Sequence, residues 1–255
     1  MNKTVLITGA SSGIGKELVK VYAANSYNLI LVARSKNKLD DLKQELEKTN
    51  KVEITNISLD LSNQDSAEEL FSIVKEKKLQ VDILINNAGF GLNGEFTEID
   101  INSQTNMINL NILTLTKLSN IFAQQMQQQN SGNIVNIAST AAFQPISNFA
   151  VYAATKAYVL SFSEAIAVEL KSKNISVTAI CPGATESNFM DSAGVKKISM
   201  LSIASSKQVA EFTFKSVNKN RVVAIHGFFN NIIIFFLRFS PRSLIRKISG
   251  SFFDN

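Results

Sequence analysis

The sequence contains one cysteine, Cys181, and one histidine, His226. A single cysteine excludes an intramolecular disulfide and favours a reducing compartment. A single histidine leaves too few of the usual transition-metal ligands, so we expect no metal site and a structural role for His226. Cys181 has no histidine or arginine beside it in the sequence, so we do not expect a nucleophilic thiol.

Long apolar runs are also lacking. The apolar run that comes nearest to the length of a membrane-spanning helix is Ile232–Leu237. It ends at Arg238 and is far shorter than the roughly 20 residues that such a helix needs. The first apolar run, Val5–Ile7, is too short for a signal-peptide core, and a glycine-rich turn follows it. We therefore expect an intracellular, cytoplasmic protein.

Linkers and strong charge asymmetry are lacking as well. Only three prolines occur, and no Gly/Ser-rich linker divides the 255 residues. The net charge of +5 could suggest nucleic acid, but the lysines are interleaved with glutamates, as in KLDDLKQELEKTNK. Such interleaving is typical of a solvated helix face, so we expect no nucleic-acid partner.

Short β-branched runs alternate with longer helical patterns. The predicted strands are Thr4–Thr8, Asn28–Ala33, Val52–Ser58, Ile83–Asn86, Asn133–Ala138, Ser176–Ile180 and Arg221–Ile225. The predicted helices are Gly13–Asn25, Lys36–Lys48, Gln64–Lys77, Asn102–Gln129, Tyr152–Ser172 and Ser206–Val217. This alternation predicts an α/β fold with a single Rossmann-type, doubly wound parallel sheet and helices on both faces.

The sequence TGASSGIG, residues 8–15, joins the first strand to the first helix. Unpaired N–H groups and the helix dipole make such a helix start an anion site. Gly9 would permit the tight turn, Gly13 would let a pyrophosphate approach the backbone, and Gly15 would let the helix pack on the sheet. The alternative is a merely flexible connection. We predict a dinucleotide site formed by Gly9, Ser11, Ser12, Gly13, Ile14 and Gly15.

The end of the second strand indicates which dinucleotide binds. Ala33 stands where NAD-binding proteins carry an acidic residue, and Arg34 follows it. A charge-assisted bond from Arg34 to a 2′-phosphate is worth about 1.5–3 kcal/mol, so we expect NADP(H) rather than NAD(H). The alternative is an arginine on a solvated loop. We further expect Asp60 and Leu61 at the adenine, and Asn87, Ala88 and Gly89 at the adenosine ribose and neighbouring loops.

Tyr152 and Lys156 lie at i and i+4, on one face of a predicted helix. Activating a tyrosine near pH 7 requires a pKa about 3 units below 10, or roughly 4 kcal/mol, which a fixed ammonium and an oxidised nicotinamide could supply. Ser139 ends the fifth strand, at the edge where ligands of such sheets bind. The alternative is an ordinary amphipathic helix.

Together, TGASSGIG, NNAG, Ser139, Tyr152-x-x-x-Lys156 and CPG at Cys181–Gly183 resemble the short-chain dehydrogenase/reductase family, over Lys3 to about Ile225. The resemblance implies a seven-stranded parallel sheet and a catalytic tetrad of Asn111, Ser139, Tyr152 and Lys156. Asn109 is the alternative tetrad asparagine. It also implies a homodimer or homotetramer.

The resemblance further assigns roles. Tyr152 exchanges a proton with the substrate oxygen and Ser139 orients that oxygen. Lys156 binds the nicotinamide ribose and lowers the tyrosine pKa, and Asn111 holds a water of the proton relay. The nicotinamide side is implied for Pro182, Gly183, Thr185 and Ser187. A lid is implied for Glu186–Ser206, with Phe189, Met190 and Met200.

The finer resemblance is to bacterial relatives of very-long-chain 3-ketoacyl reductases and 17β-hydroxysteroid dehydrogenases, which implies a bulky apolar substrate. We therefore expect residues 1–227 to form the dinucleotide-binding and catalytic domain of an NADPH-dependent ketone or aldehyde reductase. The alternatives are an oxidative alcohol or hydroxysteroid dehydrogenase and a non-catalytic dinucleotide sensor. The apolar and basic residues 228–255 would extend the domain, covering the substrate mouth or a neighbouring subunit, or would contact an anionic membrane.

Overall fold

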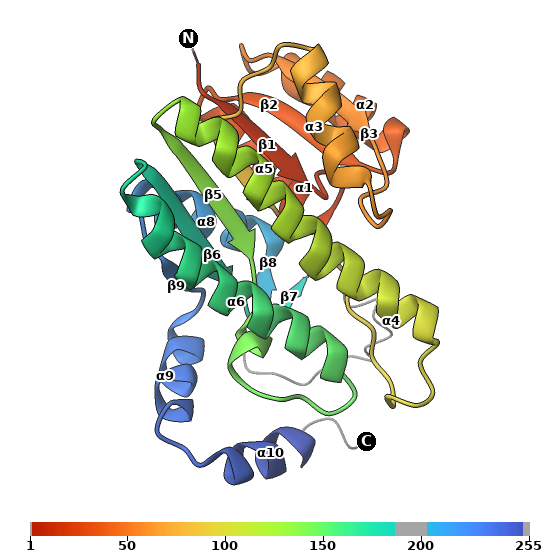
Figure 1. Cartoon of the computed structure of the whole chain (residues 1–255), viewed down its shortest axis with the longest axis vertical. Coiled ribbons are helices and arrows are strands. Elements are labelled where there is room, and N and C mark those ends of the chain that lie inside the picture. Colours follow the sequence, from red (N-terminus) through yellow and green to blue (C-terminus); the bar gives the residue numbers. More distant parts are fainter. Residues whose placement is uncertain (1, 187–202, 252–255) are drawn as a thin grey trace.

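A computed structural model describes residues 2–186 and 203–251 of the chain. Its central sheet contains the strands β1 (Thr4–Thr8), β2 (Asn28–Ala33), β3 (Ile54–Ser58), β4 (Ile83–Asn86), β5 (Gly132–Ile137), β6 (Ile175–Cys181) and β9 (Val223–Ile225). All of them run parallel, in the order β3-β2-β1-β4-β5-β6-β9 (Figure 1). The expected α/β fold with a doubly wound seven-stranded sheet is confirmed.

Helices cover both faces of this sheet. The main helices are α1 (Gly13–Ala24), α2 (Lys36–Glu47), α3 (Ser66–Glu76), α4 (Ile101–Ile108), α5 (Leu115–Gln128), α6 (Ala150–Lys171) and α8 (Ser206–Asn218). Val5 and Ile7 of β1 pack with residues of α1, α2 and α8, whereas Leu6 packs with residues of α3, α5 and α6. Because alternate side chains enter two different cores, the central strands are apolar throughout.

The helix predicted over Asn102–Gln129 is interrupted. After α4, residues Asn109–Thr114 form a π-helical turn, η1, before α5 begins at Leu115. Such turns insert an extra residue into a helix, change the direction of its side chains and are frequent at functional sites. Asn111 lies within this turn and is buried.

The structure also contains elements outside the predicted pattern. A short 3₁₀ turn, η2 (Thr140–Phe143), follows β5, and a two-stranded parallel ladder joins β7 (Thr185–Glu186) to β8 (Ala204–Ser205). The C-terminal extension forms two helices, α9 (Phe228–Leu237) and α10 (Arg242–Ser251). Within residues 2–186 and 203–251, no helix is long and apolar enough to cross a bilayer.

Tyr22 carries a buried hydroxyl into an apolar part of the core. Its ring makes edge contacts with Tyr27 and Phe214, each at 5.1 Å between centroids, and burial raises the pKa of its phenol. Among the described residues the hydroxyl has no hydrogen-bond partner. A buried polar group without a partner costs about 1–3 kcal/mol.

Tyr22→Phe is therefore expected to raise the free energy of unfolding by about 1 kcal/mol, measured by urea denaturation. Tyr158→Phe is the control, because the Tyr158 hydroxyl pairs with Thr116 Oγ1 at 2.9 Å near the surface and its removal should give no gain. A loss of stability in Tyr22→Phe larger than that of the control would contradict this account of the core.

Candidate active site

The turn between β1 and α1 has a backbone that only glycine accommodates well. Gly9 and Gly13 adopt φ values of +66° and +52°, which strain any residue with a Cβ. A Cβ on Gly15 would lie 2.1 Å from the carbonyl oxygen of Gly9, so the first turn of α1 touches the backbone of the loop. The three glycines therefore serve the close backbone approach that the sequence predicts.

The start of α1 has the properties of an anion site. Ser12 is the N-cap residue, yet its side chain makes no capping hydrogen bond, and the first turn contains no acidic residue. Ser11, Ser12, Gly13 and Ile14 are half-buried at the carboxyl end of the sheet. A pyrophosphate would therefore meet free N–H groups and the positive end of the helix dipole, so these residues fit a bound dinucleotide.

The NNAG segment fastens the loop after β4 to this glycine turn. Asn87 Nδ2 donates to the carbonyl oxygens of Thr8 at 2.9 Å and Gly9 at 3.3 Å. The backbone N–H groups of Asn87 and Ala88 both donate to Thr8 Oγ1, at 3.0 and 2.9 Å. The expected bridging role of the asparagine is present, and Thr8 is a partner that the sequence reasoning did not single out.

Arg34, Asp60 and Leu61 follow neighbouring strands at the predicted adenosine end of the site. Burial opposes ionisation of Asp60, but its Oδ1 accepts from both the backbone N–H and the hydroxyl of Ser62, at 3.0 and 2.7 Å, and these bonds lower its pKa. The positive charge of the exposed Arg34 lowers this pKa further. Leu61 is buried in the core, and its carbonyl accepts from Thr114 Oγ1 at 2.9 Å.

Ser139 and Tyr152 meet beyond the carboxyl end of β5. Ser139 caps η2, accepting from the backbone N–H of Ala141 at 3.1 Å, and its side chain hydrogen-bonds with Tyr152 in the first turn of α6. Tyr152 is half-buried, and the surrounding protein raises its pKa to about 12 against the opposing effect of the Ser139 hydrogen bond. The phenol is therefore protonated at neutral pH.

Lys156 lies one turn further along α6 and is buried. Its Nζ donates to the carbonyl oxygen of Ile137 at 2.7 Å and lies 5.7 Å from the centre of the Tyr152 ring. Burial lowers the pKa of Lys156 to about 8, so the ammonium is still the main form at pH 7. A Cβ on Gly89 would lie 3.7 Å from Nζ, which places the NNAG glycine against the same site.

Asn111 joins this group through the π-helical turn. Its Nδ2 donates to the carbonyl of Phe90 at 2.9 Å and to Thr155 Oγ1 at 3.1 Å, and its Oδ1 accepts from the backbone N–H of Phe90. The Thr155 hydroxyl in turn donates to the carbonyl of Tyr152 at 2.7 Å. The geometry thus brings Asn111 to the tyrosine and lysine, whereas Asn109 is half-buried at the start of the turn.

The segment after β6 lies beside the same edge. The carbonyl of Pro182 accepts from the backbone N–H of Thr140 at 2.8 Å, and Thr185 Oγ1 donates to the carbonyl of Gly183 at 3.0 Å. Ser187 and the central part of the predicted lid, with Phe189, Met190 and Met200, lie outside the described residues.

Residues 3–197 match the short chain dehydrogenase family. The chain belongs to this family. The protein is thus a short-chain dehydrogenase, an oxidoreductase acting on carbonyl or alcohol groups with the NAD(P) dinucleotide typical of such enzymes.

Three of the similar proteins are each 30–32% identical to this chain. The chain is 32% identical to very-long-chain 3-oxoacyl-CoA reductase-A of Danio rerio, over 71% of this chain and 58% of that protein. A short-chain dehydrogenase from Sphingobium yanoikuyae in complex with NADPH has 30% identity and a TM-score of 0.86, over 96% and 95% of the two chains. The bulky-bulky ketone specific alcohol dehydrogenase from Comamonas testosteroni has 32% identity and a TM-score of 0.80, over 92% of each chain.

Two further titratable groups of this short-chain dehydrogenase, Cys181 and His226, have pKa values shifted by burial. Burial raises the pKa of the Cys181 thiol to about 12, so the thiol stays protonated. His226 packs its ring against Phe212, at 5.1 Å between centroids, and burial lowers its pKa. Within the described parts of the chain, no group of three metal-ligating side chains occurs.

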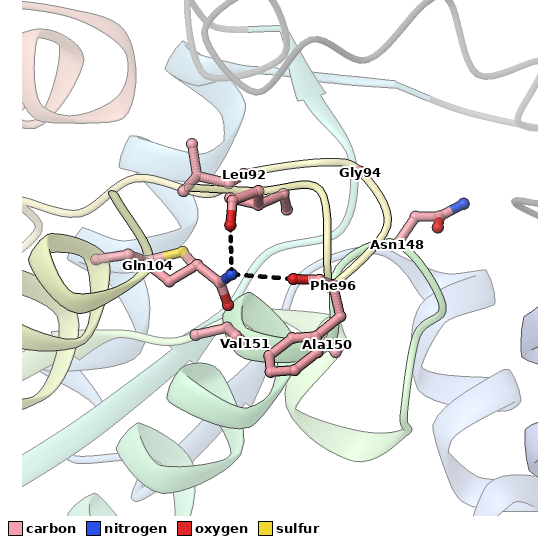
Figure 2. A pocket seen from close by; sticks show the side chains of 9 residues that line it. Leu92, Gly94, Phe96, Gln104, Asn148, Ala150 and Val151 are labelled. Atoms are coloured by element: carbon pink, nitrogen blue, oxygen red, sulfur yellow. Dashed lines mark hydrogen bonds between the residues drawn. The ribbon is translucent and has the colours of Figure 1, made fainter. Parts of the chain in front are cut away.

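A small cavity lies under the loop that follows β4 (Figure 2). Gln104 of α4 anchors this loop by donating to the carbonyl oxygens of Phe96 and Ile99, at 3.1 and 2.9 Å. The cavity has a volume of about 30 Å³ and is bordered by Val151, the residue before Tyr152. It can hold about one water molecule, so it is too small for an organic substrate.

Proposed function

We propose that this short-chain dehydrogenase is an NADPH-dependent reductase of ketone or aldehyde carbonyls with a bulky apolar substrate. The observation that carries the proposal is the meeting of Ser139, protonated Tyr152 and buried Lys156 at the carboxyl edge of the sheet. When bound, NADPH supplies the hydride. The residues proposed to hold it are Gly9, Ser11, Ser12, Gly13, Ile14, Gly15, Arg34, Asp60, Leu61, Asn87, Ala88, Gly89, Tyr152, Lys156, Pro182, Gly183, Thr185 and Ser187.

The chain's own contribution is a proton and its positioning. The Ser139 hydroxyl donates a hydrogen bond to the carbonyl oxygen, and the Tyr152 hydroxyl gives that oxygen its proton. The Lys156 ammonium holds the nicotinamide ribose and stabilises the phenolate left behind. Asn111 and its partner Thr155 fix the neighbouring turn of α6. Lys156 then returns a proton to the Tyr152 phenolate, and Asn111 belongs to the relay that brings a proton from solvent back to Lys156.

The protonation state of Tyr152 favours reduction over oxidation. Reduction uses the phenol, which its pKa of about 12 keeps protonated, whereas oxidation uses the phenolate. Below that pKa, the phenolate fraction rises about tenfold for each pH unit. We therefore expect kcat for alcohol oxidation to rise from pH 5.5 to pH 7.5, where Lys156 with its pKa of about 8 is still mainly charged, while kcat for ketone reduction changes little. Steady-state pH–rate profiles in both directions measure this. An oxidation rate that falls over this range would contradict the role of Tyr152.

Arg34 is proposed to select NADPH over NADH. Arg34→Ala is expected to weaken NADPH binding about ten- to a hundredfold, as the loss of a charge-assisted bond implies, and to change NADH binding little. The control is Lys43→Ala on the outer face of α2, whose ammonium pairs with Glu47 at 3.6 Å. Fluorescence titration with both dinucleotides measures the effect, and equal losses for NADPH and NADH would remove the phosphate role.

The proposed substrate class follows from the names of two similar proteins. The Comamonas enzyme is named for bulky-bulky ketones and the zebrafish relative for a very-long-chain 3-oxoacyl-CoA, so both named substrates are large. We propose the same class here. The test is NADPH oxidation with a panel of 3-oxoacyl, steroid, quinone and aldehyde compounds. Binding of neither dinucleotide would contradict the whole proposal.

Pairing of subunits is proposed along the helical segment of residues 102–129, which includes η1 and α5, and along α6. Val168 of α6 is 78% exposed, and Tyr158 and Leu113 lie exposed on the same helical layer. Apolar side chains in this position favour burial against a second copy, in a homodimer or homotetramer. Sedimentation velocity measures the stoichiometry.

A further inference from the structure

The outer side of α9 is covered by large apolar side chains that face solvent. Helical spacing of three and four residues aligns Phe228, Ile232, Phe235 and Phe239 in one row and Phe229, Ile233 and Phe236 in the next. All seven are exposed, Phe228 and Phe239 by 76% and 74%. We call these seven residues the aromatic face.

The inner side of α9 fixes this face in its outward orientation. Ile234 is buried, and Asn230 Nδ2 donates to the carbonyl of His226 at 2.7 Å. Asn231 Nδ2 donates to the carbonyls of Ile225 and Gly227, at 2.9 and 2.8 Å. The helix is thus anchored to the end of β9, and its apolar side is presented by a fixed element.

Positive charge borders the aromatic face. Arg238 follows α9, and Arg242, Arg246 and Lys247 lie exposed on α10, where Ile245 is buried. Arg242 and Arg246 are neighbours at i and i+4. From Phe228 to Phe253 the sequence contains no aspartate or glutamate, so no acidic residue within the segment neutralises these four cations.

The charge decides between the possible occupants of this surface. A second copy placed on the same surface by a two-fold axis would bring four more cations to the contact and, within the same segment, no carboxylate to pair with them. An anionic bilayer instead takes the apolar rings into its headgroup–acyl boundary and pairs the cations with lipid phosphates. We propose that α9 and α10 dock this protein on the surface of an anionic membrane.

The docking surface adjoins the catalytic edge. Figure 1 shows α9 and α10 beyond the end of the sheet at which β5 terminates. α9 packs beside η2, the turn after Ser139, and a Cβ on Gly183 would lie 2.5 Å from Asn230 Nδ2. If the proposed function holds, docking places the carbonyl site next to the bilayer, from which a bulky apolar ketone can enter.

The test is co-sedimentation of the full chain with phosphatidylcholine vesicles, with and without phosphatidylglycerol. Wild-type protein is expected to bind the phosphatidylglycerol vesicles, less so at high salt. The exposed pair Phe235→Glu and Phe236→Glu should lower binding at least about tenfold, since it places two carboxylates at the boundary. Arg242→Gln with Arg246→Gln should also lower it about tenfold or more.

The matched control removes the same charge elsewhere. Lys51→Gln with Lys173→Gln changes two exposed lysines that precede β3 and β6, at the opposite end of the sheet, and should leave vesicle binding unchanged. Circular dichroism of each variant shows whether it is folded. Vesicle binding needs neither NADPH nor turnover, so failure of the membrane proposal is separate from failure of the proposed reaction.

Two results would overturn the proposal. The first is wild-type protein that ignores phosphatidylglycerol vesicles while Phe235→Glu with Phe236→Glu turns an oligomer into a monomer in sedimentation velocity, because a second copy then covers the aromatic face. The second is equal vesicle binding by the wild type and this double variant.

Discussion

Tyr152→Phe is expected to lower kcat for carbonyl reduction by about 10³-fold, because the variant retains the ring but has no proton to donate. The hydroxyl that is lost is the one that hydrogen-bonds with Ser139 and lies one helical turn from Lys156. The phenyl ring preserves packing, so the dissociation constant for NADPH should stay within a few-fold. Steady-state kinetics and fluorescence titration measure the two quantities.

Tyr158→Phe supplies a matched control on the same helix. Its hydroxyl pairs with Thr116 Oγ1 near the surface, away from the proposed reacting atoms, so its removal should leave kcat unchanged. If Tyr152→Phe keeps a tenth or more of wild-type turnover, the proton comes from another group and the role of the tetrad is wrong.

Gly15→Ala is expected to reduce NADPH affinity about ten- to a hundredfold and to lower stability by about 1–3 kcal/mol. The added Cβ would lie 2.1 Å from the carbonyl oxygen of Gly9 and 2.6 Å from Asn87 Nδ2. Neither the Gly9 backbone nor the hydrogen-bonded Asn87 side chain can move without a cost in free energy. We therefore expect α1 to shift and to move its N-terminal N–H groups away from the bound pyrophosphate. Titration with NADPH and thermal unfolding measure the two effects.

Gly132→Ala separates the loss of affinity from the loss of stability. Its Cβ would meet the side chain of Met126, which is also a severe overlap but lies at the amino end of β5, across the sheet from the glycine turn. This control should destabilise the fold while the folded protein keeps its NADPH affinity. Equal loss of affinity in both variants would show that Gly15 matters only for stability.

The sheet was predictable because the strands are buried on both faces. β1, β2 and β4 begin and end at the predicted residues, since polar side chains enter either core only where they find a hydrogen-bond partner. β3 and β9 begin at Ile54 and Val223, two residues after the predicted starts. The carbonyls of residues 53 and 222 still accept a hydrogen bond from the neighbouring strand, but the regular register begins after them. The ends of the predicted strands also predicted where the candidate site lies. Glycine turns and hydroxyl side chains that follow parallel strands all lie at the same edge of the sheet.

The details around Asn111 were not predictable from periodicity. The apolar pattern runs through residues 109–114 without a break, so nothing in it marks the π-helical turn that directs Asn111 toward Thr155. Thr8 and Thr155 were not predicted as site residues either. A hydroxyl next to a known motif has no distinctive sequence pattern, and its role becomes clear only from its hydrogen-bond partners in the structure. Pairing of Asn86 Nδ2 with Asn136 Oδ1 at 2.9 Å joins two strands and has no local sequence signature either.

For the C-terminal segment, composition limited what the sequence could predict. Its apolar and basic composition predicted an extension, but composition alone could not choose between a buried element and an exposed one. The structure gives α9 both properties: Ile234 and Asn230 face the domain, and the aromatic face remains exposed.

The most direct test of the central proposal follows the hydride itself. The enzyme is incubated for one fixed, short time with a bulky ketone and NADPH that carries deuterium in both nicotinamide C4 positions, and the alcohol is examined by mass spectrometry and NMR. The account predicts one deuterium on the carbinol carbon with wild-type protein and almost none with Tyr152→Phe. Loss of NADPH without deuterium in an alcohol product, or equal labelling by both proteins, would contradict it.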